Sequence, residues 1–212
     1  MKFGTAQIKP FALLLLVAFL SMAAGVSFWR WTQTGATPEP SALIVLPAPR
    51  VIADFRLVDQ DGRPFTLDEL RGKWSLMFFG FTHCPDVCPS ALYDLEQVHK
   101  SLGQEGSHLA PHQVIFVSVD PERDTPARMK EYVHYFDPDF LGVTGETVQM
   151  RPLTRQLGVA WRIEEHEPGS QQYTVDHSAS VLLMDPDGRL YGVFPAPLDP
   201  AKMSADLLQV LG

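Results

Sequence analysis

The residues best able to do chemistry are two cysteines, Cys84 and Cys88, which are the only cysteines in the chain. They follow a run of apolar residues, and Pro89 directly after them is typical of the first turn of a helix. At a helix start, unpaired backbone N–H groups and the helix dipole lower the pKa of a thiol. A thiolate is both the nucleophile of disulfide exchange and a ligand for soft metals, so this pair suits either chemistry.

The spacing of the cysteines leaves three interpretations open. A structural disulfide would close a loop of only five residues, which gains little stability from chain entropy. A redox dithiol is the second interpretation, although thioredoxin-type enzymes place two residues between their cysteines and this chain has three. The third is a metal site, in which both sulfurs converge on one ion and at least one further ligand is needed.

Among the seven histidines, His177 is the best candidate for a third ligand. It stands just before an apolar run at 181–184, and in a thioredoxin plan the loop entering that strand lies beside the cysteine turn. Oxidoreductases of that plan carry a proline in this loop, whereas this chain has Asp176 followed by His177. His83 is the second candidate, disfavoured because it adjoins Cys84 and neighbouring side chains in a turn usually point apart.

The elements that position these residues form an α/β pattern. A short hairpin is predicted at 55–66, where Asp61-Gly62 supplies the turn. The order of strands and helices predicts a thioredoxin-like fold, a mixed central sheet with flanking helices. Apolar runs predict buried strands at 74–79, 114–119, 181–184 and 190–194, with a shorter strand at 140–143. Helical spacing of apolar residues predicts helices between 91 and 102 and at 126–136, 148–157 and 199–211.

The N-terminal residues 1–31 predict a membrane anchor. Lys2 and Lys9 precede an uncharged run at 11–29, which spans about 28 Å as a helix. Lysines ahead of such a run stay cytoplasmic, so we expect a single-pass protein of the inner (cytoplasmic) membrane with its C-terminal domain on the periplasmic side. A cleaved signal peptide is the alternative, because Ala23-Ala24-Gly25 suits a peptidase, but the apolar run continues past that site.

Residues 32–50 are predicted to be a proline-rich linker, and residues 51–212 the folded domain. Prolines at 38, 40, 47 and 49 are incompatible with a helix or a central strand, so a semi-extended spacer is expected. The formal charge of −8 and the pI near 5.3 argue against a general nucleic-acid binder, which needs a basic face.

Taken together, the motifs resemble those of the SCO/SenC family. The similarity covers roughly residues 53–211, and the order and spacing of the motifs agree throughout. A Cys-Pro-Asp-Val-Cys-Pro segment with a distant Asp-His pair is very specific. The matching segments are Asp61–Phe65, Gly80–Pro89, Ser118–Pro126 and Val175–His177.

This resemblance implies a thioredoxin-like copper chaperone that delivers copper to the binuclear copper site of cytochrome c oxidase subunit II. It implies that Cys84, Cys88 and His177 bind copper, as Cu(I), Cu(II) or both, and that the cysteines also form a redox pair able to reduce the target. Asp120 matches an acidic residue near the family's site. Asp120 and Asp176 are therefore expected beside the metal without binding it. Other periplasmic copper carriers and thiol reductants are expected as further partners.

The chemistry of the donor set agrees with this implication. Two thiolates and one imidazole suit Cu(I), and with an added oxygen they accommodate Cu(II). Structural zinc would want a fourth protein ligand. The alternative function is a membrane-anchored thiol–disulfide oxidoreductase or peroxidase that works without metal. His177, in a loop without proline, favours copper delivery.

Overall fold

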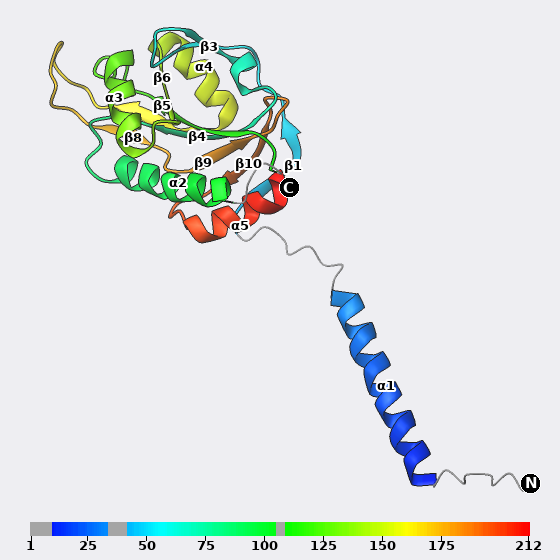
Figure 1. Cartoon of the computed structure of the whole chain (residues 1–212). Helices are drawn as coiled ribbons and strands as arrows, with labels where there is room; N and C mark the ends of the chain where they lie inside the picture. Colours follow the sequence, from blue (N-terminus) through cyan, green and yellow to red (C-terminus); the bar gives the residue numbers. More distant parts are fainter. Residues whose placement is uncertain (1–9, 34–41, 105–108) are drawn as a thin grey trace, which may run out of the picture. The chain divides into compact units, whose positions relative to one another are not determined.

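The computed structural model describes residues 10–33, 42–104 and 109–212 (Figure 1). The chain divides into two compact units, Met1–Glu39 and Pro40–Gly212. The second unit holds the sheet, the cysteines and every candidate site residue, so the site belongs to one folded body.

The first unit contributes one described element, helix α1 (Pro10–Gln33). Over the described residues, no helix combines the length and the apolarity needed to cross a membrane. The predicted anchor at 1–31 and the predicted linker at 32–50 fall partly on residues 1–9 and 34–41, which lie outside the described ranges.

An eight-stranded mixed sheet runs through the second unit as the structure describes it. Its centre is parallel, because β4 pairs in parallel with β5 and β5 with β6, while the remaining neighbours pair antiparallel. The α/β, mixed-sheet arrangement predicted from the sequence is confirmed. In spatial order the strands are β1 (Ile44–Arg50), β10 (Leu190–Phe194), β9 (Val181–Met184), β4 (Trp74–Gly80), β5 (His112–Ser118), β6 (Leu141–Thr144), β2 (Arg56–Asp59) and β3 (Pro64–Thr66).

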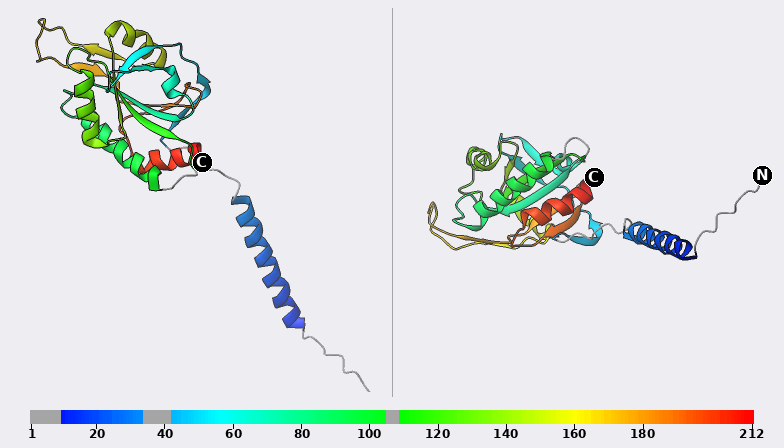
Figure 2. Two further views of the ribbon diagram at one scale, coloured as in Figure 1. Left: turned by 45° about the horizontal axis from the view of Figure 1, so that its top comes forward. Right: turned by 60° about the horizontal axis from the view of Figure 1, so that its bottom comes forward.

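Helices cover both faces of this sheet. α2 and α5 lie side by side against one face, and α4 lies across the other, next to β2 (Figures 1 and 2). Because the central strands are buried on both sides, they carry continuous apolar runs, and Phe78 and Phe116 on neighbouring strands are fully buried. The helices of this unit are α2 (Val87–Gln104), α3 (Pro126–Phe136), α4 (Thr147–Leu157), α5 (Pro200–Leu211) and the short 3-10 helix η1 (Leu67–Leu70).

A second, two-stranded sheet was not predicted. It pairs β7 (Trp161–Ile163) with β8 (Val175–His177), and the chain between them forms a long hairpin loop. Each strand is only three residues long, too short for an alternating pattern to stand out from the polar residues around it. His177 ends β8, so this hairpin carries the candidate third ligand.

The predicted linker is corrected at its C-terminal end, because Ile44–Arg50 forms β1 and pairs antiparallel with β10. Two prolines are tolerated there because β1 is an edge strand, where a missing N–H costs no ladder hydrogen bond. The buried carboxylate of Asp206 on α5 accepts hydrogen bonds from the N–H groups of Ala42 (2.6 Å) and Leu43 (2.9 Å), which fixes the entry of the chain into the sheet.

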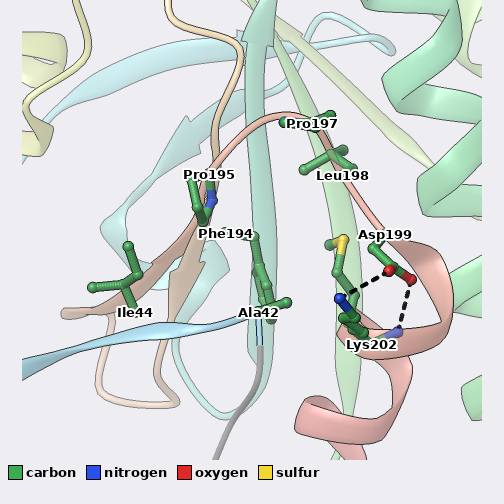
Figure 3. A pocket seen from close by; sticks show the side chains of 9 residues that line it. Ala42, Ile44, Phe194, Pro195, Pro197, Leu198, Asp199 and Lys202 are labelled. Carbon is green, nitrogen blue, oxygen red and sulfur yellow. Dashed lines mark hydrogen bonds and ion pairs between the residues drawn. The ribbon is translucent and has the colours of Figure 1, made fainter.

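Beside this entry lies a hollow of about 340 Å³. Figure 3 shows Ala42 and Ile44 on one side of it and the start of α5 on the other, where Asp199 accepts a hydrogen bond from the backbone N–H of Lys202. This part of the chain therefore packs as part of the domain.

Candidate metal centre

The cysteines lie on the turn between the end of β4 and the start of α2. The N–H of Cys84 donates to the carbonyl of Phe81 (3.2 Å), which closes the turn ahead of the helix. Cys84 is half-buried, whereas Cys88, in the first turn of α2, is fully buried. The N–H of Cys88 donates to the sulfur of Cys84 (3.4 Å), so a backbone donor at the helix start faces that sulfur.

His177 reaches this turn from the end of β8. Its Nε2 lies 3.3 Å from the sulfur of Cys88, and its Nδ1 lies 3.1 Å from the carbonyl oxygen of Ser178. A carbonyl only accepts, so Nδ1 carries the proton and Nε2 is the nitrogen with a free lone pair. The edges of Phe78 and Phe81 pack against the imidazole at 6.0 and 5.8 Å between ring centroids, which restricts its orientation.

These three side chains form a cluster with metal-ligand spacing. The sulfurs of Cys84 and Cys88 and a ring nitrogen of His177 all lie within 4.8 Å of one another. Both cysteines are free thiols in this structure. Two sulfurs and one imidazole make a soft donor set of low coordination number, which fits a thiophilic ion such as copper better than a hard cation.

The two thiols differ in acidity. The hydrogen bond from the Cys88 thiol lowers the pKa of Cys84 to about 4, and the backbone N–H groups of Asp86 and Cys88 act in the same direction against the effect of burial. The same hydrogen bond, together with burial, raises the pKa of Cys88. At neutral pH the pair therefore consists of one thiolate and one thiol that share a proton.

Gly80 makes room for the buried sulfur. A Cβ atom at this position would lie 2.5 Å from the sulfur of Cys88 and 2.8 Å from the ring of Phe116. Both neighbours are fully buried and have little space to move. Glycine at the end of β4 is therefore a requirement of the metal cluster.

Asp124 anchors the cysteine turn through hydrogen bonds to its carboxylate. This role was not apparent from the sequence. The carboxylate accepts hydrogen bonds from the N–H (2.9 Å) and hydroxyl (2.6 Å) of Thr82 and from the hydroxyl of Ser118 (2.6 Å). Burial raises the pKa of Asp124, although these hydrogen bonds oppose the shift. The motif around Asp120 contained this residue, but only the contacts distinguish it from its neighbours.

Asp120 does not touch the three donors. It is fully buried, accepts from Nε of Arg123 (2.5 Å) and accepts from the hydroxyl of Tyr173 (2.6 Å). Asp120 is expected to influence the metal without binding it, and in this structure its carboxylate is held in an ion pair with Arg123. That ion pair reaches the cluster through Phe81, whose ring lies 5.5 Å from the Arg123 guanidinium and 5.8 Å from His177.

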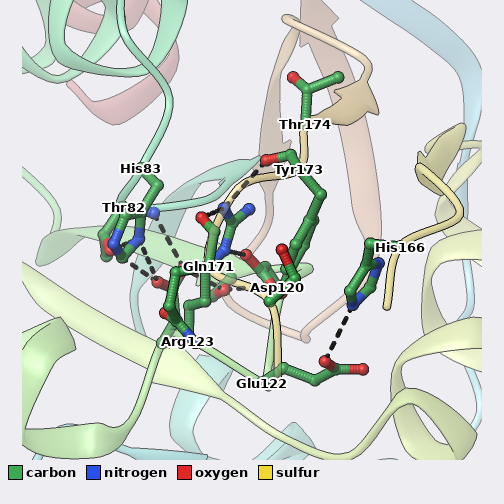
Figure 4. A network of polar contacts seen from close by, with 12 residues as sticks. Thr82, His83, Asp120, Glu122, Arg123, His166, Gln171, Tyr173 and Thr174 are labelled. Atoms are coloured by element: carbon green, nitrogen blue, oxygen red, sulfur yellow. Dashed lines mark hydrogen bonds and ion pairs between the residues drawn. The ribbon is translucent and has the colours of Figure 1, made fainter. Parts of the chain in front are cut away.

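The network around Arg123 fastens the hairpin that carries His177 (Figure 4). Nη1 of Arg123 donates to the carbonyls of Gln171 (3.1 Å) and Tyr173 (2.9 Å), and its guanidinium stacks 3.6 Å from the Tyr173 ring. His166 stacks on the other side of that ring at 3.7 Å and pairs with Glu122. The strand leading into His177 is therefore anchored to the loop that follows β5.

A family model described as SCO1/SenC matches residues 46–212 of the chain. The chain belongs to the SCO1/SenC family. The human protein named "Protein SCO2 homolog, mitochondrial" is 44% identical over 135 residues, which cover 64% of this chain and 50% of that protein.

Solved members of the SCO1/SenC family share the fold. The structure titled "Structure of Bradyrhizobium japonicum ScoI with copper bound" has 38% identity and a TM-score of 0.66, covering 76% of this chain and 99% of that one. The apo Sco1 protein from Thermus thermophilus has 34% identity and a TM-score of 0.71, covering 83% and 100%. The predicted thioredoxin-like fold is confirmed by these likenesses and by the mixed central sheet.

The remaining candidates lie outside the cluster in this SCO1/SenC chain. Asp176 is exposed and forms an ion pair with Arg162 (2.9 Å). It is exposed because successive residues of a strand face opposite sides, and His177 faces the cysteines. His83 lies 3.2 Å from the hydroxyl of Thr82 and is not grouped with the cysteines among the described residues.

Proposed function

We propose that this protein binds copper through Cys84, Cys88 and His177 and delivers it to the binuclear copper site of cytochrome c oxidase subunit II. The single observation that carries the proposal is the convergence of two sulfurs and one imidazole nitrogen within 4.8 Å. Membership of the SCO1/SenC family supports it, as does the copper-bound state of the similar Bradyrhizobium japonicum ScoI.

The cluster suits an ion that must be released again. Its sulfur ligands match Cu(I), and an added oxygen ligand accommodates Cu(II). Only three protein donors converge there among the described residues, so an incoming ligand has a coordination position to occupy. Cys84 is the more exposed of the two sulfurs, which makes it the one that a partner reaches first.

Copper binding is tested by titrating the reduced full-length chain with Cu(I) against a chelator of known affinity. We expect one tightly bound ion per chain, and Cys84→Ser and Cys88→Ser should each abolish tight binding. His83→Ala is the matched control, because this histidine adjoins Cys84 but lies outside the cluster. Unchanged affinity in both serine variants would refute the site.

Delivery is tested in cells that lack the chain. We expect oxidase activity and the copper content of subunit II to fall, and to recover with the wild-type chain but not with Cys88→Ser. Added copper should restore part of the activity. Full copper occupancy of subunit II in the deletion strain would refute this role while leaving copper binding by the isolated chain intact.

A second candidate function is reduction of a target disulfide, favoured by the unequal pKa values of the two thiols. The Cys84 thiolate attacks one sulfur of the target and releases the other, which forms a mixed disulfide. Cys88 then loses its proton and attacks Cys84, which releases the target as a dithiol and leaves the chain oxidised. A thiol reductant must return it to the reduced form.

Thiol counting separates the two roles. Oxidation joins Cys84 to Cys88, so the oxidised chain should bind copper far more weakly, and Cu(I) should protect both thiols of the reduced chain from alkylation. For exchange, Cys88→Ser should accumulate a mixed disulfide with a peptide of the subunit II copper loop. Equal copper binding by the oxidised and reduced chains would refute the ligand assignment.

We also propose that Asp120 acts on the metal indirectly, as a positioning residue. Its ion pair with Arg123 and its hydrogen bond from Tyr173 hold the hairpin from which His177 projects. Losses outside the metal's own ligands typically cost about 10–100-fold in affinity or activity. Asp120→Asn with unchanged copper affinity would show that this network serves the fold alone.

The proposal for the cellular location of this protein is based on its sequence. We propose that residues 1–31 anchor it in the inner membrane and that the copper-binding domain lies on the periplasmic side. Alkaline phosphatase fused after Gly212 should then be active, and the chain should remain with membranes after a carbonate wash. An inactive fusion would reverse the orientation, and release by carbonate would refute the anchor.

A further inference from the structure

An open groove of about 470 Å³ borders the cysteine turn. Asp86 and Val87, which lie between the two cysteines, line it on the side of α2. Figure 3 shows Pro197 and Leu198 on the loop between β10 and α5, and this loop lines the other side. The groove therefore lies directly beside the metal cluster.

The groove is open because small side chains line it. Ala91 and Ala196 contribute to its surface, as does Ala179, two residues beyond His177. Val87 is 44% exposed there, a large fraction for an apolar side chain in the first turn of a helix. An apolar hollow with polar residues at its rim is typical of a surface that binds another molecule.

The length of the groove follows from the helix that lines it. Val87, Ser90, Ala91 and Asp94 recur at helical spacing and so share one face of α2. The helix rises about 10 Å between Val87 and Asp94. An extended chain rises about 3.3 Å per residue, so the groove accommodates about three residues of an extended segment.

The charged residues of the groove are both acidic. Asp86 and Asp94 line it, and no lysine or arginine does so in the described part of the chain. Asp94 is partly buried, and its carboxylate makes no hydrogen bond or ion pair with the described residues. Burial and the charge of Asp199 raise the pKa of Asp94, so a cation would stabilise its ionised form. Lys202 pairs instead with Asp199 (3.5 Å; Figure 3).

A protein that takes the ion from this site must cover the start of the groove. Ligand exchange begins at Cys84, the more exposed sulfur. An incoming thiol loses its proton as it binds Cu(I), and the sulfur that it displaces takes a proton up. The backbone N–H of Asp86 faces the Cys84 sulfur, and Asp86 also lines the groove. A segment that places a thiol against Cys84 therefore has the groove directly beside it.

We propose that this groove binds an extended segment of the copper-accepting protein, with an apolar side chain against Val87 and Leu198 and a lysine or arginine paired with Asp94. The inference rests on the proposed copper delivery, because that function requires a partner at Cys84. Apolar contact gives the segment affinity, and the charge pair sets its direction along α2. The copper ligand of the segment lies about three residues from its basic side chain.

Docking is measured without copper, by fluorescence anisotropy of a dye-labelled peptide that carries a leucine next to a lysine and no cysteine or histidine. The reduced full-length chain should bind it. Ser90→Trp fills the groove from an exposed position and should weaken binding about 10-fold or more, the contribution of one buried apolar side chain. Gln97→Trp is the matched control, because Gln97 is exposed on the same helix but lies outside the groove.

Charge reversal tests the ion pair. Asp94→Lys should weaken binding about 5-fold, and a peptide with glutamate in place of lysine should bind this variant better than the wild type. Asp54→Lys is the control for overall charge, because Asp54 is exposed and lies outside the groove. Circular dichroism verifies the fold of each variant. No binding of the lysine peptide at about 1 mM, or no preference of the glutamate peptide for Asp94→Lys, would overturn the proposal.

Copper transfer separates this inference from the proposed function. Ser90→Trp and Asp94→Lys should keep wild-type Cu(I) affinity, because neither residue belongs to the cluster. They should nevertheless deliver Cu(I) more slowly to a peptide with two cysteines on the side of the leucine away from the lysine. Wild-type transfer rates in both variants would overturn the inference and leave copper binding intact. A wild-type chain that docks the peptide but binds no Cu(I) would support the docking surface and refute copper delivery. A dimer that Ser90→Trp disrupts would assign the groove to a second copy and overturn the proposal.

Discussion

The cysteine turn and the hairpin that ends in His177 meet at one point but are positioned in different ways. Cys84 and Cys88 are held by a single turn of chain between β4 and α2, whereas His177 lies 89 residues beyond Cys88. The turn takes its geometry from the start of a helix. The hairpin has only a short two-stranded sheet of its own and depends on contacts with the rest of the domain.

Both regions are nevertheless fastened to the same loop. Asp124 accepts hydrogen bonds from Thr82 in the cysteine turn, and Asp120 accepts one from Tyr173 in the hairpin. The N–H of Asp124 donates to the carbonyl of Asp120 (3.0 Å), so the two carboxylates are fixed relative to each other. This difference shows that local structure is enough to bring the two sulfurs together, whereas the position of the imidazole depends on tertiary contacts.

Of the changes that leave both sulfurs in place, removing the hairpin's ligand should have the largest effect. His177→Ala should weaken Cu(I) binding by more than the about 10–100-fold typical of groups outside the ligand set, because it removes one of three donors. Alkylation of Cys84 should remain fast, since its acidity comes first from Cys88. Chelator competition and alkylation rates measure the two effects. Wild-type affinity would mean that the third ligand lies elsewhere, with His83 the next candidate.

The acidity of Cys84 should show in its reactivity with pH. A thiol with an ordinary pKa of about 8.5 is almost wholly protonated at pH 6, whereas Cys84, with a pKa of about 4, is a thiolate there. Its alkylation by iodoacetamide should therefore stay fast down to about pH 5 and fall below about pH 4, while Cys88 remains unmodified.

Cys88→Ser is the sharper version of this experiment. Replacing the thiol by a hydroxyl shortens the side chain and alters the hydrogen bond that does most to lower the pKa of Cys84. Alkylation of Cys84 at pH 6 should become slower. An unchanged rate would assign the acidity to the helix start alone.

Gly80→Ala should disturb the turn from within the sheet. The added Cβ collides with the Cys88 sulfur and the Phe116 ring, and overpacking of this kind costs about 1–3 kcal/mol of unfolding free energy. Copper affinity should fall as the sulfur is displaced. Gly103→Ala on α2 is the control, because a Cβ there meets nothing within 4 Å. Denaturant unfolding of both variants decides whether the sulfur needs this space.

Tyr173→Phe should have the smallest effect. It removes the hydroxyl that donates to Asp120 and keeps the ring between Arg123 and His166, so stability should fall by about 1–2 kcal/mol. Copper affinity should fall about 10-fold, the lower end for an indirect group. NMR signals of the His177 ring should shift, which a purely structural loss would not produce.

Arg162→Gln is the control for that variant, because it breaks an exposed ion pair with Asp176 on the same hairpin. Exposed pairs contribute about 0–1 kcal/mol, so neither copper affinity nor the His177 signals should change. A loss equal to that of Tyr173→Phe would mean that any disturbance of the hairpin displaces the histidine.

Much of the fold could be predicted because the central strands and helices carry long, regular apolar patterns. The sequence places strands at 74–79 and 114–119; β4 contains the first, and β5 overlaps the second up to Ser118. β1 was missed because its prolines exclude a central strand, and edge position cannot be recognised before the sheet order is known. β7 and β8 were missed because three residues are too few to show a period.

The residues of the candidate site were likewise predictable only in part. The cysteines were identified from their own spacing, and His177 from its place in the expected fold. The role of Asp124 could not be predicted, because two carboxylates in one short motif differ only in which donors the fold brings to them. Asp176 is expected near the metal, but it neighbours His177 in β8 and therefore faces the opposite side of the strand, where it pairs with Arg162.

The edges of the large sheet have a consequence for solubility. An edge strand presents unpaired N–H and C=O groups to any other extended chain, which makes it a starting point for aggregation. Here the outer strands are β1 and β3. β1 contains Pro47 and Pro49, and β3 begins with Pro64, so each outer strand lacks N–H donors that a further strand would need. Two copies of this domain therefore meet an interrupted ladder wherever they approach edge to edge, and the sheet resists growing beyond its own eight strands.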